Sequence, residues 1–307
     1  MSLRLGVSPI AWANDDMPEL GGDTPVETVL SDAAAIGFAG VELGGRFPRE
    51  ATELGPLLAH HRLSLIGGWY ATHLLVRTAE AEFEALRSHL SLLTAMGSPV
   101  FIAAECSNAI HGDRGRPIED SPRLPATDWP WFGERMSAVA ARVAAAGLRF
   151  AYHFHLGTVV ERRDDLEAFL AHTTADVGLV VDTGHAALGG VDAAQLILSH
   201  PDRVAHVHAK DVRRGVFDTL RLRRGSFLDG VLAGMFTVPG DGDLDFDIVT
   251  RALGEVGYDG WIVIEAEQDP KRADPRAYSA VGLATIERSV VAAGLIPDPR
   301  GAPAGSA

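Results

Sequence analysis

The sequence predicts one α/β domain folded as a closed (β/α)8 barrel of parallel strands, with its active site at the carboxyl ends of the strands. Two observations predict this fold. Eight short β-branched or apolar runs recur along the chain, and amphipathic segments rich in Ala and Leu alternate with them. Each helical crossover returns the chain in the same direction, so the strands are parallel, and eight of them favour a barrel over an open sheet.

The barrel is expected to span residues 1–295. The strand candidates are residues 3–10, 40–44, 63–70, 100–106, 149–155, 177–185, 204–211 and 261–267. Helix candidates between them include residues 24–37, 81–97 and 128–147, whose apolar residues repeat every three or four positions. Residues 296–307 are rich in Pro, Gly and Ala, and we expect them to form a disordered tail.

Several helix candidates carry recognisable ends. A glycine suited to the left-handed C-cap closes each of four candidates just before the next strand, namely Gly37, Gly97, Gly147 and Gly257. Thr24 and Pro25 predict an N-cap followed by a proline at the first helical position. Asp128 is expected to be another N-cap, with Pro130 in the first turn of its helix.

The segment of residues 212–246 is too long for a simple connection, and we expect it to form a lid that includes a short helix at residues 226–234. The chain's one basic cluster begins it, with Arg213, Arg214, Arg221, Arg223 and Arg224. The simpler interpretation is a solvated loop that balances an acidic protein. The alternative is a site for an anionic ligand such as glutathione.

Composition narrows the classes of function. The 307 residues are 47% hydrophobic, which is ample for a large core. A formal charge of -14 argues against a nucleic-acid partner, because a phosphate backbone requires a positive face. Cys106 is the single cysteine, so neither an intrachain disulfide nor a thiolate cluster is expected. The sequence shows no signal peptide and no membrane span, so we expect a cytoplasmic protein without a membrane partner.

Polar side chains mark the ends of successive strand candidates. They are Glu42 on the second strand, His153 and His155 on the fifth, Asp182 and His185 on the sixth, His206, His208, Lys210 and Asp211 on the seventh, and Glu265 and Glu267 on the eighth. Four consecutive strands thus end in side chains able to bind metal, and parallel strand ends meet at one edge. The sequence predicts a metal site there, of a type that suits Mn²⁺, Co²⁺, Fe²⁺ or Zn²⁺.

Alternation along each strand leaves the ligand choice open. His153 and His155 share one face of their strand, as His206 and His208 share a face of theirs. In each pair, one interpretation makes the deeper residue a hydrogen-bonded core group and the other residue a metal ligand. Glu265 and Glu267 pose the same choice.

The strand-end motifs carry a family resemblance. "DTGH" (182–185), "HVHAKD" (206–211) and "VIEAE" (263–267) resemble the divalent-metal TIM barrels of the xylose isomerase-like sugar isomerase/epimerase superfamily. "WANDDMPELGG" (12–22) and "YHFHLGTVVE" (152–161) resemble its dehydratase branch, which acts on 2-keto-myo-inositol in inositol catabolism.

The resemblance implies a metal ligand at the end of each of strands five to eight. Asp182, His208 and Glu265 match the last three positions, and His185 matches a residue that touches substrate. Strand five departs from the superfamily pattern, because histidines stand where many relatives have a glutamate. His153 is our first choice for that ligand, followed by His155 and then Glu161.

The resemblance also implies the chemistry. A divalent metal, expected to be Mn²⁺ or Co²⁺, polarises a ring ketone, a base removes the neighbouring proton, and the β-hydroxyl leaves as water. Glu265 or Glu267 is the expected base, and His185 or His155 the expected acid. Lys210 either stabilises the developing oxyanion or forms a salt bridge with a neighbouring acid such as Asp211.

Three further residues are expected at the substrate. Glu42 either bonds a ring hydroxyl or anchors a loop, Trp12 forms a wall for the ring or belongs to the core, and Asn14 bonds a hydroxyl. The expected partner is a small polyhydroxy ketone, and the chain is compatible with a homo-oligomer.

Three rival functions use the same barrel. A ketose isomerase or 3-epimerase would require a glutamate on strand five, where this sequence has His153 and His155. A metal-dependent endonuclease would want a basic face. A non-catalytic sugar-binding protein would not need the full set of ligands.

Overall fold

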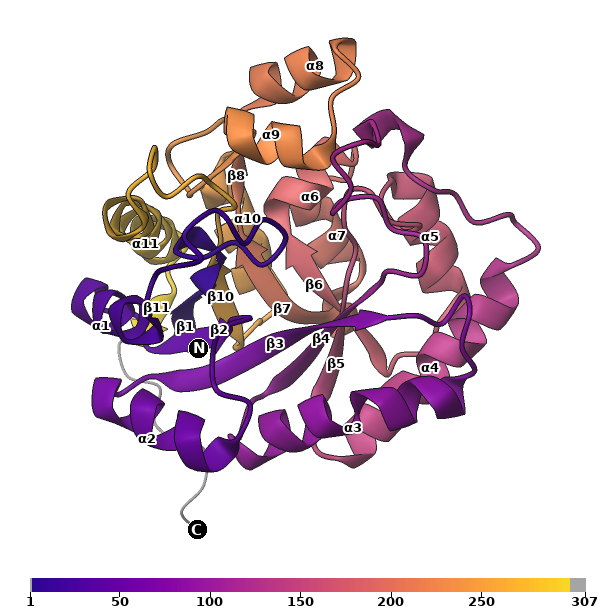
Figure 1. Ribbon diagram of the computed structural model, residues 1–307, viewed down its shortest axis with the longest axis horizontal. Helices are drawn as coiled ribbons and strands as arrows, with labels where there is room; N and C mark the ends of the chain where they lie inside the picture. Colours follow the sequence, from indigo (N-terminus) through magenta and orange to yellow (C-terminus); the bar gives the residue numbers. More distant parts are fainter. Residues whose placement is uncertain (1, 299–307) are drawn as a thin grey trace.

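The computed structural model describes residues 2–298 and confirms a closed barrel of eight parallel strands (Figure 1). These strands are β1 (Ser2–Val7), β2 (Gly40–Leu43), β3 (Ser64–Thr72), β4 (Val100–Glu105), β5 (Arg149–His153), β6 (Val177–Asp182), β7 (Val204–Ala209) and β10 (Trp261–Ile264). Strands adjacent along the barrel pair in parallel, and β10 pairs with both β7 and β1, which closes the ring. Every strand candidate from the sequence therefore contributes to the barrel.

Helices surround the barrel in Figure 1. They are α1 (Val26–Ile36), α2 (Ala51–His61), α3 (Ala79–Ala95), α4 (Trp129–Ala145), α5 (Arg163–His172), α6 (Thr183–Leu188), α7 (Ala193–Ser199), α10 (Phe246–Glu255) and α11 (Pro275–Ala292). Short 3-10 turns lie at Pro9–Ala11, Ile118–Asp120 and Pro201–Arg203. Within residues 2–298, no helix is both long enough and apolar enough to cross a membrane.

The helix ends follow the sequence with two corrections. All four predicted C-cap glycines have positive φ values, between 67° and 111°. Helix α1 begins one residue late, because Pro25 precedes it and the Thr24 hydroxyl donates instead to the Trp12 carbonyl. Asp128 precedes α4 as expected, but its carboxylate accepts from the Thr127 hydroxyl and does not cap the helix.

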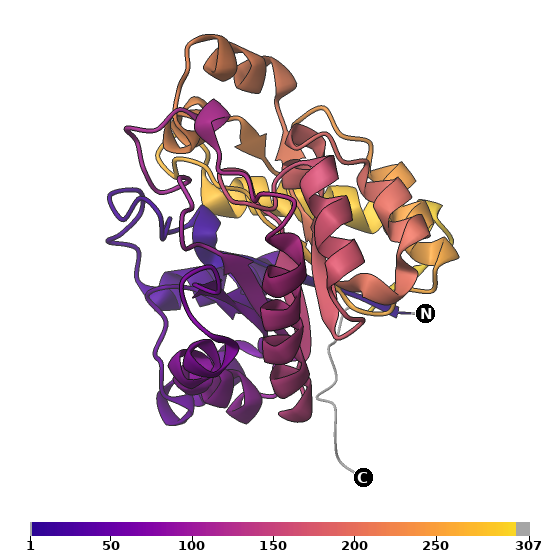
Figure 2. The ribbon, with the colours of Figure 1, turned by 90° about the vertical axis from the view of Figure 1, so that its right-hand side faces the viewer.

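The long segment before α10 folds as a small unit, which both views show projecting at one end of the molecule (Figures 1 and 2). It contains β8 (Asp211–Val212), α8 (Arg214–Leu222), α9 (Phe227–Ala233) and β9 (Phe236–Thr237), with β8 and β9 antiparallel. Helix α9 is the short helix predicted at residues 226–234. Ser226 and Asp229 cap it reciprocally, and Gly234 ends it with a φ of 80°.

The expected tail begins too early. Strand β11 (Ile296–Asp298) pairs in parallel with the start of β1, so residues 296–298 extend the sheet and are not part of a tail. Residues 299–307 lie outside the described residues.

Apolar side chains fill the barrel beneath the strand ends. One internal cluster contains Ile102, Ala151 and Val180, and another contains Ile66 and Trp261. A side chain at Gly40 would overlap Ile66 and crowd the Trp261 ring, so glycine gives these two residues their space. This packing forms an apolar layer beneath the polar strand ends.

Candidate active site

The polar strand ends meet around one cavity with an empty volume of about 680 Å³. Six predicted site residues line it, namely Glu42, His153, His155, His208, Glu265 and Glu267. They come from β2, from β5 and the residues just after it, from β7 and from the segment directly after β10, as the barrel geometry predicts.

Three of the four predicted metal ligands, His153, His208 and Glu265, line this cavity, and the buried Asp182 lies within 3.5 Å of two of them. The Asp182 Oδ2 atom lies 3.5 Å from His153 Nε2 and 3.5 Å from His208 Nδ1. His208 Nδ1 also lies 2.7 Å from Glu265 Oε2. Asp182 Oδ2 and His208 Nδ1 are buried and make no hydrogen bond of good geometry to any residue between 2 and 298. Buried ligand atoms that face one another without hydrogen bonding suit a shared divalent cation.

Asp182 has two roles at the end of its strand. Its Oδ1 atom accepts the His185 backbone N–H at 2.8 Å and caps α6, which leaves Oδ2 directed toward the imidazoles. Burial opposes the charged carboxylate, but Lys210 and His185 hold the pKa of Asp182 well below its usual range. A strand that runs directly into a helix therefore explains why this aspartate stands at a buried tip.

Glu42 anchors two histidines and not a loop. Its Oε1 atom lies 2.9 Å from Nε2 of both His206 and His208. Burial favours the neutral acid, yet these imidazoles hold the pKa of Glu42 below its usual range. A proton on His208 Nε2 that bonds Glu42 leaves Nδ1 free to bind metal. His206 lies deeper than His208 and does not line the cavity, so it is the core member of the pair.

Lys210 occupies the space between the carboxylates. Its Nζ atom lies 2.7 Å from Glu265 Oε1, 2.9 Å from Glu267 Oε1 and 3.6 Å from Asp182 Oδ2. Burial disfavours its charge, but these acids raise the pKa of Lys210 well above its usual value.

Lys210 does pair with acids, as the alternative interpretation expected, but Asp211, the acid given as an example, is not one of them. Asp211 turns away and accepts the backbone N–H groups of Val212, Gly240, Gly242 and Leu244, which organises the loop after β9.

A second group of possible ligands is already occupied. His155, His185 and Glu267 place donor atoms within 4.8 Å of one another. Lys210 Nζ stands among them, 3.1 Å from His185 Nε2 and 2.9 Å from Glu267 Oε1. An ammonium group in this position takes the place of a second cation. Burial, only partly offset by Lys210, raises the pKa of Glu267 to about 7.

Two expected substrate contacts are wrong. Trp12 is 2% exposed, and its indole N–H donates to Asp32, away from the cavity. Asn14 is buried, and its Oδ1 atom accepts the backbone N–H groups of Asp16 and Met17. The loop after β1 uses Asn14 to make a tight turn that presents its neighbours to the cavity instead.

Among the cavity residues that the sequence did not predict, four carry a carboxylate, an imidazole or an indole: Asp15, Asp16, His111 and Trp69. Trp69 lies in β3, near the end of the strand candidate at residues 63–70. Its ring centroid is 5.3 Å from that of His153 and 5.7 Å from that of His155. Asp15, Asp16 and His111 lie in loops, where no periodic signal marks the side that faces a cavity.

The remaining candidates lie outside the cavity. Glu161, the third choice for the strand-five ligand, accepts the Gly157 N–H at 2.7 Å and does not line the cavity. Within the basic cluster, Arg213 pairs with Asp241, and Arg221 and Arg224 pair with Glu119. These pairs match the simpler interpretation, in which the arginines balance surface acids.

Residues 30–287 match the family described as xylose isomerase-like TIM barrel. The chain belongs to this family. A xylose isomerase domain protein from Alicyclobacillus acidocaldarius has the same fold, with a TM-score of 0.68 at 17% identity over 96% of this chain and 100% of that one.

Two curated relatives are more similar to this xylose isomerase-like protein in sequence. The rhizopine catabolism protein MocC of Rhizobium meliloti is 42% identical, over 96% of this chain and 90% of its own. An inosose dehydratase of Geobacillus thermodenitrificans is 38% identical, over 90% of this chain and 94% of its own.

Proposed function

We propose that this xylose isomerase-like protein is a divalent-metal-dependent hydro-lyase that dehydrates 2-keto-myo-inositol in inositol catabolism. Four relatives named inosose dehydratase are 35–38% identical over 90–91% of the chain. The observation that carries the proposal is the clustering of His153, Asp182, His208 and Glu265 at the carboxyl ends of neighbouring strands, beside the buried Lys210.

These four side chains would hold the metal. Bound Mn²⁺ or Co²⁺ would supply a Lewis acid that polarises the substrate ketone. Two imidazoles with two carboxylates suit these ions better than Ca²⁺, which prefers oxygen donors alone. Lys210 adds a fixed positive charge next to Glu265 and Glu267, where negative charge develops on the substrate.

Glu267 and His155 are the groups best placed to move protons. Both line the cavity, and Glu267 Oε2 has no hydrogen-bond partner in the described part of the chain. His155 Nδ1 lies 2.7 Å from the Leu156 carbonyl, so the ring proton stays there and Nε2 is free to accept another. One of this pair removes the proton α to the ketone, and the other donates a proton to the departing β-hydroxyl, which leaves as water.

Glu265 and His185 are less suited to proton transfer. Both Glu265 oxygens lie 2.7 Å from a nitrogen, Oε2 from His208 Nδ1 and Oε1 from Lys210 Nζ. His185 is 1% exposed and lies behind the cavity wall, where its Nδ1 accepts the Leu156 N–H. We therefore assign Glu265 to the metal and His185 to the positioning of Lys210.

Replacing Glu267 by Gln should lower kcat by about 10² to 10⁴-fold, because the amide keeps the shape but cannot take or give the proton. Metal content, measured by elemental analysis, should not change. Glu161→Gln is the matched control, since Glu161 is a buried carboxylate outside the cavity. Normal turnover by Glu267→Gln would remove this residue from the mechanism.

Trp69 replaces Trp12 as the apolar wall that we assign to the substrate ring. It lines the cavity and is 39% exposed, so a broad apolar face stands next to the two histidines at the end of β5, His153 and His155. Trp69→Ala should raise KM about tenfold, a loss near 1.4 kcal/mol, with a much smaller change in kcat. Trp131→Ala, on the outer helix α4, should leave KM unchanged.

Direct assay separates the candidate functions. The purified protein with Mn²⁺ or Co²⁺ should convert 2-keto-myo-inositol to a trihydroxycyclohexanedione, whose conjugated system absorbs in the ultraviolet. A ketose isomerase or 3-epimerase would instead turn over a free ketose without that absorbance, and this alternative is not favoured by the names of the relatives. Parallel reactions with and without glutathione test the anionic-ligand interpretation of the arginines.

A second candidate substrate comes from rhizopine catabolism, because MocC is 42% identical over 96% of the chain. Rhizopine and its breakdown products therefore belong in the same assay. Turnover of these compounds alone, with 2-keto-myo-inositol untouched, would assign the protein to that route.

A further inference from the structure

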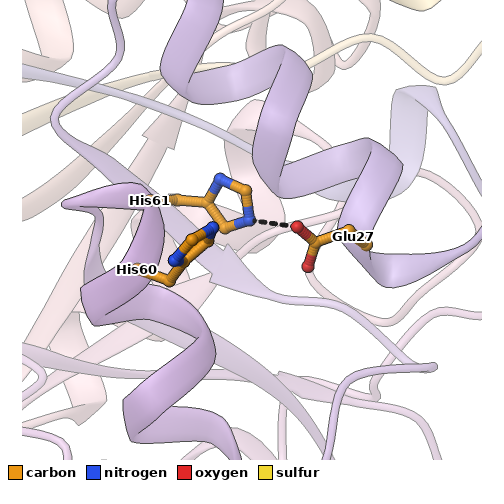
Figure 3. Close-up of side chains that lie close together, drawn as sticks. All are labelled: Glu27, His60 and His61. Atoms are coloured by element: carbon orange, nitrogen blue, oxygen red, sulfur yellow. Dashed lines mark hydrogen bonds and ion pairs between the residues drawn. The ribbon is translucent and has the colours of Figure 1, made fainter.

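A second cluster of metal-binding side chains lies on the outside of the barrel, on α1 and α2 (Figure 3). Glu27 stands in the first turn of α1, and His60 and His61 end α2. Their ligand atoms all lie within 4.8 Å of one another. The geometry points to a surface site for a transition-metal ion, separate from the proposed active site, that joins these two helices.

The contacts within the cluster support this site. His61 Nε2 lies 2.9 Å from Glu27 Oε1, and the His60 ring stands edge-on to the His61 ring with centroids 4.9 Å apart. Figure 3 shows both imidazoles reaching from one helix toward the carboxylate of the other. Only 10% of the His61 side chain is exposed, so one ligand is held by packing while Glu27 and His60 remain free to adjust.

The donor set selects the type of ion. Two imidazoles and one carboxylate, with a position left for water, suit Zn²⁺, Cu²⁺ or Ni²⁺ better than Mg²⁺ or Ca²⁺. No lysine or arginine among residues 2–298 forms an ion pair with Glu27. In the buried group of His155, His185 and Glu267, by contrast, Lys210 fills the place of a cation. The formal charge of -14 further favours cation binding.

A metal ion here would link α1 to α2. Helix α1 directly follows the loop that carries Asp15 and Asp16 to the active-site cavity. Joining its first turn to the end of α2 adds a constraint between two helices that otherwise meet through side-chain packing and one hydrogen bond. Binding to the folded protein alone raises its thermal stability.

Zinc counting tests the site. Wild type and the Glu27→Gln/His60→Ala double variant are dialysed to equilibrium against Zn²⁺, and bound zinc is measured by elemental analysis. The wild type should hold one more zinc ion per chain than the double variant, because any active-site zinc is common to both. Zn²⁺ should also raise the Tm of the wild type more than that of the variant.

Both replaced side chains are exposed, so the double variant should fold, and circular dichroism checks this. Glu53→Gln/His200→Ala removes an exposed acid and an exposed imidazole elsewhere and should bind zinc as the wild type does. Equal zinc content and equal Tm shifts in wild type and Glu27→Gln/His60→Ala would overturn the proposal and leave a simple His61–Glu27 hydrogen bond.

Discussion

Asp182→Asn should abolish activity and lower metal affinity by more than about 100-fold, while the barrel stays folded. The amide oxygen can still accept the His185 N–H that caps α6. The other carboxylate oxygen becomes an NH2 group that faces His153 and His208 and cannot bind a cation. Loss of a direct ligand should exceed the 10 to 100-fold cost of losing a supporting partner.

The measurements are metal content after gel filtration, turnover, and the Tm of the metal-free protein. Asp192→Asn is the matched control, because Asp192 caps α7 through the Gln195 N–H in the same manner but lies outside the cavity. It should retain metal and activity. A fully active, metal-loaded Asp182→Asn protein would show that the ligand assignment is wrong.

Lys210→Met should lower kcat at least 100-fold and destabilise the fold by about 3–5 kcal/mol in the absence of metal. The substitution keeps the buried chain but removes the charge that pairs with Glu265, Glu267 and Asp182. Removing one partner of a buried ionic group leaves uncompensated charge and carries a cost of this size. The loss of rate reflects the missing positive charge near the substrate.

Chemical denaturation and steady-state kinetics measure the two effects. Lys271→Met, at an exposed position, should change neither. If Lys210→Met does not fold, the Lys210→Met/Glu267→Gln double variant removes one of the stranded negative charges and should recover part of the stability without recovering activity. A Lys210→Met protein with normal stability and rate would contradict the central place of this ammonium group.

The sequence predicted the barrel and the polar strand ends because both depend on local periodicity. Parallel strands joined by helical crossovers must end at one edge, so residues at those ends converge wherever the barrel closes. The strand ends therefore placed His153, Asp182, His208 and Glu265 among the candidates, and the family resemblance implied these four as the ligands. Glycines with positive φ at the helix ends were predictable for the same local reason.

The partners of those residues were decided by the tertiary structure. Glu42 meets His208 across 166 positions of sequence, and Lys210 meets Glu267 across 57, because closure of the barrel brings strands of unrelated sequence position together. The Lys210–Asp211 pairing was the wrong choice between neighbours in sequence, since the two side chains point to different regions.

The loops show the same limit. Trp12 and Asn14 belong to a turn whose side chains face inward to the protein, while Asp15, Asp16 and His111 reach the cavity. Loop backbones follow no period, so a sequence does not reveal which side chain faces the substrate. The sequence by itself determined the fold and which strand ends carry the chemistry; the tertiary structure alone decided which oxygen meets which nitrogen, because those distances depend on how the whole ring of strands closes.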